Sequence, residues 1–126
     1  MNQEINNLFK LPSLLEPIDL SSFGVINKHV FVKRDDLIHP VVSGNKWRKL
    51  KCNVKEYFAG NYVGIVTFGG AHSNHILAMS YLAKFYGIPT IIFVRGEKPK
   101  MLNPTLKKCY ELGVELTFIS RETYKR

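Results

Sequence analysis

The apolar positions of this chain recur in two spacings, which together predict an alternation of strands and helices. Short runs rich in aliphatic, β-branched and aromatic residues predict strands at residues 29–34, 62–68, 90–94 and 114–119. Apolar residues three or four apart predict helices at residues 46–59, 73–86 and 104–112. The first 22 residues carry scattered apolar positions and two prolines, so we expect an irregular arm there with at most a short helix.

Glycine, asparagine and proline mark the ends of the predicted helices. Gly60 and Asn61 follow the first helix and predict the left-handed ending that such residues favour. Gly87 and Pro89 stop the second helix. Asn103, followed directly by a proline, predicts the start of the third, because asparagine caps a helix and proline fits its first turn.

The connections between these elements are short, and the run at residues 62–68 is apolar almost throughout, which is typical of a buried parallel strand. The pattern predicts right-handed βαβ units and an α/β fold class, an open parallel sheet with covering helices. Ligands of such sheets bind at the carboxyl ends of the strands, where residues 43–46 and 69–75 follow predicted strands. The final strand at 114–119 would leave an open edge that invites self-pairing.

Length and composition narrow the class of protein. The 126 residues suffice for one small domain with a core, and 45% hydrophobic residues predict a globular, soluble chain. No apolar run is long enough to span a bilayer, and the N-terminus has no signal-peptide pattern. Cys52 and Cys109 are far apart and fit no metal or redox motif, so we expect a reducing, cytoplasmic setting and no membrane partner.

The formal net charge of +8 raises nucleic-acid binding as an alternative. The basic residues are spread over residues 46–55, 98–108 and the C-terminus, and no recognisable nucleic-acid module accompanies them. A solvated basic surface is therefore the favoured interpretation, and nucleic acid is not expected as a partner.

Residues 43–51, Ser-Gly-Asn-Lys-Trp-Arg-Lys-Leu-Lys, contain the first candidate for chemistry. Ser43 and Asn45 are good helix caps, and Gly44 permits close approach of a ligand. Lys46 would then stand in the first helical turn, where the helix dipole and desolvation both favour the neutral amine. A neutral amine attacks an aldehyde to form a Schiff base. On this feature alone, an ordinary solvated lysine is the favoured alternative.

The second candidate is the loop at residues 69–75, Gly-Gly-Ala-His-Ser-Asn-His. Its two glycines let the backbone approach a ligand, and Ser73 and Asn74 at the start of the next helix could hold a carboxylate. The simpler alternative is that one of them only caps the helix. His72 and His75 are three apart, but no third metal ligand is evident, and a Gly-x-Gly-x-x-Gly dinucleotide pattern is absent. We therefore expect no metal site.

Three motifs in this order resemble one enzyme family: Lys-Arg-Asp-Asp at 33–36, Ser-Gly-Asn-Lys-Trp-Arg-Lys-Leu at 43–50, and the loop at 69–75. The chain resembles the pyridoxal-phosphate enzymes of the 1-aminocyclopropane-1-carboxylate (ACC) deaminase and D-cysteine desulfhydrase family. That family has the tryptophan-synthase-β-like fold, also called fold type II. The match runs from about residue 30 to residue 119.

The resemblance implies a role for each candidate residue. Lys46 would carry the cofactor, pyridoxal 5'-phosphate, through a Schiff base, and Asn45 would shape the pocket beside it. Asn74 would contact the ring hydroxyl of the cofactor and also bind substrate. Ser73 would meet the substrate carboxylate and assist proton abstraction. His72 and His75 would complete the substrate site, and His72 stands where several members have glutamine or tyrosine, which could alter substrate preference.

The resemblance also implies the reaction. The expected enzyme is a pyridoxal-phosphate-dependent lyase or deaminase that acts on a small amino acid, either ACC or D-cysteine, and releases ammonia and a 2-oxo acid. The expected assembly of the complete protein is a homodimer. The alternatives from other classes are a truncated, non-catalytic α/β domain and, less favoured, a basic nucleic-acid-binding module.

Members of the family are more than twice as long as this chain. Their glycine-rich phosphate loop and the partner of the ring nitrogen lie beyond the matched part. The resemblance therefore implies that residues 1–42 form an arm and first strand of a large domain, and residues 43–126 a small α/β domain. We expect the 126 residues alone to be inactive.

Overall fold

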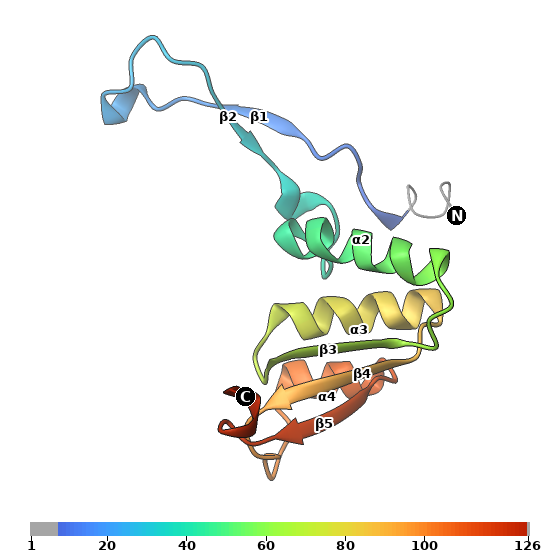
Figure 1. Cartoon of the computed structure of the whole chain (residues 1–126). Helices are drawn as coiled ribbons and strands as arrows, with labels where there is room; N and C mark the ends of the chain where they lie inside the picture. The colour runs from blue at the N-terminus through green and yellow to red at the C-terminus, as the bar shows by residue number, and fades with distance from the viewer. Residues whose placement is uncertain (1–7, 126) are drawn as a thin grey trace.

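The computed structural model describes residues 8–125, which form an antiparallel ribbon and a layered α/β unit (Figure 1). Its strands are β1 (Leu15–Ile18), β2 (Val30–Lys33), β3 (Ile65–Gly70), β4 (Thr90–Arg95) and β5 (Glu115–Ile119). Its helices are α2 (Gly44–Ala59), α3 (Asn74–Tyr86) and α4 (Pro104–Glu111), with 3-10 turns η1 (Ser21–Phe23), η2 (Asp35–Leu37) and η3 (Thr123–Lys125). None of the helices formed by residues 8–125 has the length and apolar character that crossing a lipid bilayer requires.

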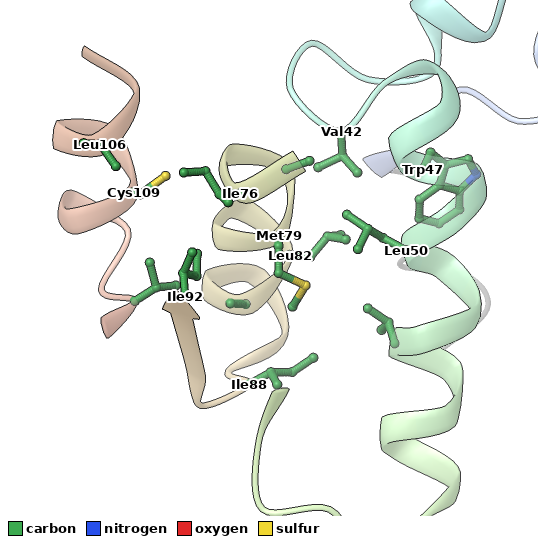
Figure 2. Packing of buried hydrophobic residues seen from close by; sticks show 14 of the residues in the cluster. Val42, Trp47, Leu50, Ile76, Met79, Leu82, Ile88, Ile92, Leu106 and Cys109 are labelled. Carbon is green, nitrogen blue, oxygen red and sulfur yellow. The ribbon is translucent and has the colours of Figure 1, made fainter. Parts of the chain in front are cut away.

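Strands β3, β4 and β5 form a parallel sheet in that order, which confirms the predicted α/β class. Helices α3 and α4 contact each other and pack on one side of it. Ile92 of β4 is fully buried there, in the same cluster as Ile76 of α3 and Leu106 of α4 (Figure 2). Burying a side chain of this size contributes roughly 1.5–3 kcal/mol relative to leaving it exposed.

Helix α2 forms a further layer, because it packs on α3 rather than on the sheet (Figure 1). Leu50 of α2 points toward Met79 and Leu82 of α3, as the apolar spacing of both helices predicts (Figure 2). Trp47 of α2 is buried in the same cluster. The ring of Trp47 also stacks on Phe9, with ring centroids 3.9 Å apart. This interface fixes the start of α2 relative to the start of α3.

No α-helix among residues 8–125 packs on the second face of the sheet, where Tyr124 of η3 contacts Phe68 edge-on at a centroid distance of 6.2 Å. The prediction of a buried strand at 62–68 was therefore wrong: β3 begins only at Ile65, and its side chains from Ile65 to Phe68 alternate between half-buried and exposed. In β3, Val66 and Phe68 are 55% and 53% exposed, although Phe68 stacks on Phe93 of β4 at a centroid distance of 5.3 Å. A continuous apolar run marks both faces as apolar, but only tertiary packing decides whether both are covered.

The N-terminal part differs most from the sequence prediction. The predicted strand at 29–34 exists as β2, but it pairs antiparallel with β1 and does not lead into the parallel sheet. Strand β1 lies where an irregular arm was expected, with Leu15 opposite Lys33 and Ile18 opposite Val30. The ribbon extends away from the helical layers (Figure 1). The strand β1 is stabilised by hydrogen bonds to β2, and a local sequence pattern does not reveal such a partner.

Two details of the helix ends also differ. Helix α2 begins at Gly44, two residues earlier than predicted, and Ser43 has N-cap geometry without a side-chain cap hydrogen bond. At its other end Gly60 is extended, with φ −109° and ψ −179°, so the left-handed ending was wrong. The predicted stop of α3 at Gly87 is confirmed, and Gly87 takes the left-handed conformation there, with φ 65°. The predicted cap of α4 is confirmed too, since Asn103 Oδ1 accepts from the Leu106 amide at 2.9 Å.

Candidate functional site

Lys46 lies in the first turn of α2, at the wall of a pocket of about 320 Å³. Its Nζ donates a hydrogen bond to Asn45 Oδ1 at 2.7 Å. The wall is completed by one loop and by the start of α3; its lining residues are Asp36, Pro40, Val41, Ser43, Gly44, Asn45, Lys46, Asn74 and Leu77. The structure thus brings together Lys46, Asn45 and Asn74, the three residues that the sequence assigned to the cofactor.

Gly44 has a positive φ of 55°, which side chains with a β-carbon adopt only with strain. A β-carbon added there would meet no other atom within 4 Å. The requirement for glycine is therefore conformational: it lets the chain turn from the loop into α2 directly before Lys46. Gly69 serves a different purpose from the expected ligand approach, because a β-carbon there would lie 2.5 Å from Ile76 Cγ2. It permits close packing of α3 on β3.

The loop before Lys46 is held by a buried histidine that sequence reasoning missed. His39 Nδ1 accepts hydrogen bonds from the amides of Val41 and Val42, both at 3.0 Å. The ring is 6% exposed and lies near the rings of Phe9 and Tyr81, at centroid distances of 5.2 and 4.7 Å. Because Nδ1 accepts, the neutral ring carries its proton on Nε2. Burial lowers the pKa of His39, which favours this neutral form.

A second device ties the same loop to α2. Asp35 accepts two hydrogen bonds from Arg48, from Nε to Oδ2 at 2.8 Å and from Nη2 to Oδ1 at 2.7 Å. The buried Ser13 hydroxyl donates to Asp35 Oδ1 at 2.6 Å, and the Lys33 amine donates to the Ser13 carbonyl at 2.6 Å. Hydrogen bonds from Arg48 and then Ser13 hold the pKa of Asp35 well below its usual range. The motif at 33–36 therefore connects the ribbon to the helix that carries Lys46.

Ser73 and Asn74 are neighbours in the chain but line different cavities. Ser73 is the N-cap of α3, and its Oγ accepts from the His75 amide at 3.2 Å, as the simpler alternative predicted. Asn74 lines the Lys46 pocket, whereas Ser73 and His72 line a separate, larger cavity. Neighbouring residues of one motif thus serve two cavities.

His75 faces the sheet. Its Nε2 lies 2.8 Å from Thr67 Oγ1, within hydrogen-bond distance, and it lines neither of these two cavities. Burial, followed by the positive charges of Lys46 and Lys49, lowers the pKa of His75. The ring is therefore neutral at neutral pH and connects the start of α3 to the core of the sheet.

The larger cavity has a volume of about 920 Å³ and lies at the carboxyl edge of the sheet. Its lining residues are Gly70, Ala71, His72, Ser73, Arg95, Gly96, Glu97, Pro99, Met101, Asn103 and Arg121. Sequence reasoning missed Arg95 and Arg121. Arg95 directly follows the predicted strand at 90–94, and Arg121 lies two residues after the predicted strand at 114–119. Because ligands bind at the carboxyl ends of parallel strands, these positions could have identified both arginines.

Within residues 8–125, no group of three or more His, Cys, Asp or Glu side chains is placed to hold a metal ion. Cys52 is exposed and Cys109 is buried, and both are free thiols. The chemistry available at the two cavities is therefore that of an amine, amides, hydroxyls, an imidazole, guanidinium groups and the carboxylates of Asp36 and Glu97.

Several known proteins similar to this chain carry the names of ACC deaminases or D-cysteine desulfhydrases. No protein-family model matches the chain. Over 99 residues it is 40% identical to a putative ACC deaminase of Thermotoga maritima, covering 78% of this chain and 31% of that protein. A bifunctional D-cysteine desulfhydrase/ACC deaminase of Arabidopsis thaliana is 28% identical over 127 residues, which cover 94% of this chain and 31% of that enzyme.

Solved structures give the same result. The crystal structure of an ACC deaminase homologue matches with a TM-score of 0.70 at 25% identity, covering 94% of this chain and 38% of that one. A pyridoxal 5'-phosphate-dependent aspartate racemase shares the fold, with a TM-score of 0.57 at 16% identity, covering 94% of this chain and 36% of that one. The chain is therefore related, over about a third of their length, to the ACC deaminases and D-cysteine desulfhydrases, and its fold is that of part of a pyridoxal-phosphate enzyme of fold type II.

Proposed function

We propose that this chain supplies the lysine-bearing part of a pyridoxal-phosphate-dependent lyase or deaminase. The substrate would be a small amino acid, ACC or D-cysteine, and the products would include ammonia and a 2-oxo acid. The names of the relatives support this reading, since they include ACC deaminases and D-cysteine desulfhydrases. We further propose that the working assembly is a homodimer.

One observation carries the proposal: the amine of Lys46 and the side chains of Asn45 and Asn74 converge on one pocket at the starts of two helices. The donor set fits the cofactor. An amine is the group that condenses with the cofactor aldehyde, and side-chain amides can donate to its ring hydroxyl. When bound, pyridoxal phosphate supplies a ring that withdraws electrons from the α-carbon of an amino acid.

The residues of this chain would attach the cofactor, move the proton and bind the substrate carboxylate. Lys46 Nζ is the attachment atom, and once released it can hold the proton removed from the α-carbon. Asn45 Oδ1, which accepts from Nζ at 2.7 Å, holds the amine at the pocket wall. Ser73, with the amides at the start of α3, would receive the substrate carboxylate, and His72 lies beside it in the same cavity.

By themselves, the 126 residues are expected to bind the cofactor weakly and to show no turnover. Pyridoxal phosphate carries close to two negative charges on its phosphate, which needs several backbone donors in a preformed loop. Carbanion chemistry also requires a closed, dry site.

Reductive trapping tests the assignment of Lys46. The protein is incubated with a limiting amount of pyridoxal phosphate, reduced with borohydride, digested and mapped for the labelled lysine. We expect the label at Lys46 ahead of Lys49 and Lys51, and its loss from that peptide in Lys46→Ala. The matched variants Lys49→Ala and Lys51→Ala should retain it. Equal or stronger labelling of Lys49 or Lys51 would refute the assignment.

A further inference from the structure

The larger cavity is distinct from the Lys46 pocket, since the two share no lining residue. It is formed where the parallel strands end: Gly70 closes β3, Arg95 closes β4, and Arg121 lies two residues beyond β5. Parallel strands bring these carboxyl ends to one edge, which is where open α/β sheets bind ligands. Its volume of about 920 Å³ suits a small organic molecule with its hydration water better than a bare ion.

The charges of this cavity are unbalanced. Its charged lining residues are the guanidinium groups of Arg95 and Arg121 and one carboxylate, that of Glu97. Among residues 8–125, no ion pair neutralises either arginine. His72 adds an imidazole, whereas the Asn103 side-chain nitrogen already donates to the Ala71 carbonyl and lies 3.4 Å from His72 Nδ1. The cavity thus presents a surplus of positive charge and of donors to whatever enters it.

The walls of the cavity are held in place by contacts of Arg95 and Asn103. The Arg95 guanidinium lies over the ring of Tyr124, 5.7 Å from its centroid, which leaves the edge of the guanidinium available. Asn103 Nδ2 donates to the Ala71 carbonyl at 3.0 Å, while its Oδ1 caps α4. The loop after β3 is therefore tied to the start of α4, and a preorganised wall lowers the entropy lost on binding.

We propose that this cavity binds a small organic carboxylate, with Arg95 and Arg121 as its charged contacts. A guanidinium group pairs with a carboxylate through two parallel hydrogen bonds, a geometry that lysine does not provide. The inference rests on the proposed function, which places the substrate carboxylate at Ser73 in this same cavity, and adds Arg95 and Arg121 as its charged contacts. The binding of a free carboxylate to these arginines needs neither Lys46 nor a cofactor. Its failure would therefore leave the assignment of Lys46 untouched.

Calorimetric titration at constant ionic strength tests the site, with malonate as the carboxylate probe and inorganic phosphate as the comparison anion. We expect saturable malonate binding at one site, and a higher thermal unfolding midpoint with malonate present. Arg95→Gln and Arg121→Gln should each weaken malonate binding about tenfold, as the loss of a charge-assisted hydrogen-bonded pair predicts. Glu97→Gln removes the opposing charge and should tighten binding about twofold to threefold.

The control is Lys84→Gln. It removes the same charge from the last turn of α3, at the opposite end of that helix from the cavity. Malonate affinity should stay within about twofold of the parent protein, because solvent and salt screen a charge at that distance. Equal weakening by Lys84→Gln and Arg121→Gln would overturn the proposal, since it would show a diffuse effect of net charge. An affinity for inorganic phosphate equal to the affinity for malonate would also overturn the proposal. If Arg95→Gln fails to fold, the folded Arg121→Gln variant still provides the test.

Discussion

At the scale of single residues, His39 is the least expected feature of the chain. A histidine in a loop reads as a solvated side chain, yet this ring is buried and accepts two backbone hydrogen bonds through one nitrogen. Protonation would convert that acceptor into a donor and leave the amides of Val41 and Val42 without partners. Both valines directly precede Ser43 and the start of α2 in the chain. By binding their amides, His39 fixes the backbone that leads into the Lys46 pocket.

His39 should make the stability of the protein pH-dependent. Its folded-state pKa lies below the ordinary value of 6.5. The stability it contributes is therefore fully present above pH 6.5 and is lost as the pH falls below 6.5 toward the folded pKa. We expect the urea midpoint to fall between pH 7.5 and pH 5, with the lowered pKa of His75 contributing in the same direction.

The variant His39→Gln separates the contribution of His39 to the pH dependence of stability from that of His75. It should reduce the free energy of unfolding at pH 7.5 by about 1–3 kcal/mol, the cost of leaving buried donors unpaired, and flatten the dependence on pH. The control His29→Gln replaces an exposed histidine of the ribbon and should change neither quantity. An unaltered pH dependence in His39→Gln would contradict this role of His39.

At the scale of elements, the start of α2 is set by η2 rather than by its own cap. Ser43 makes no side-chain cap hydrogen bond, but Arg48, one turn into the helix, is held by both oxygens of Asp35. The segment from η2 through the first turn of α2 forms most of the pocket wall. The Asp35–Arg48 pair is therefore a positioning device for Lys46.

Breaking this pair should loosen the pocket before it unfolds the protein. We expect Asp35→Asn and Arg48→Gln to slow the reductive labelling of Lys46 severalfold, and Arg48→Lys to restore it in part, because one charged contact remains. The control is Glu16→Gln, which breaks the 2.6 Å pair with Arg34 within the ribbon and should leave the labelling rate unchanged. If Asp35→Asn lowers only the urea midpoint, and Lys46 is labelled at the parent rate, the pair stabilises the fold without positioning Lys46.

At the scale of the whole molecule, the layers are covered unevenly. Helices α3 and α4 bury one face of the sheet, and α2 buries the far side of α3. The other face presents Val66 and Phe68, each more than half exposed, next to Phe93. Exposed apolar area of this kind beside an open strand edge favours association of the purified 126-residue chain.

Replacing Phe68 tests whether this exposed apolar face causes the chain to self-associate. We expect the 126-residue chain to self-associate with rising concentration in sedimentation experiments, and Phe68→Thr to reduce this association, because threonine keeps the strand preference while removing apolar area. The control Phe85→Thr changes a phenylalanine of α3 that is 43% exposed, away from the sheet face. Self-association that persists in Phe68→Thr would assign it to another surface.

Much of the α/β unit was determined by sequence alone. The predicted bounds of α3, β4 and α4 lie within one or two residues of those observed, because their signals are local: the cap at Asn103, the left-handed Gly87, and apolar spacing within a single helix. The paired motifs at 43–50 and 69–75 likewise identified the family, which the known relatives confirm.

What the tertiary structure decided depends on residues far apart in the chain. The pairing of β1 with β2, the hold of Asp35 on Arg48 and the burial of His39 between Phe9 and Tyr81 each join segments that no periodicity relates. The same holds for the division of Ser73 and Asn74 between two cavities, and for the presence of Arg95 and Arg121 in the lining of one cavity. Sequence patterns report which face of an element is apolar, whereas its contacts follow from how all the elements pack together.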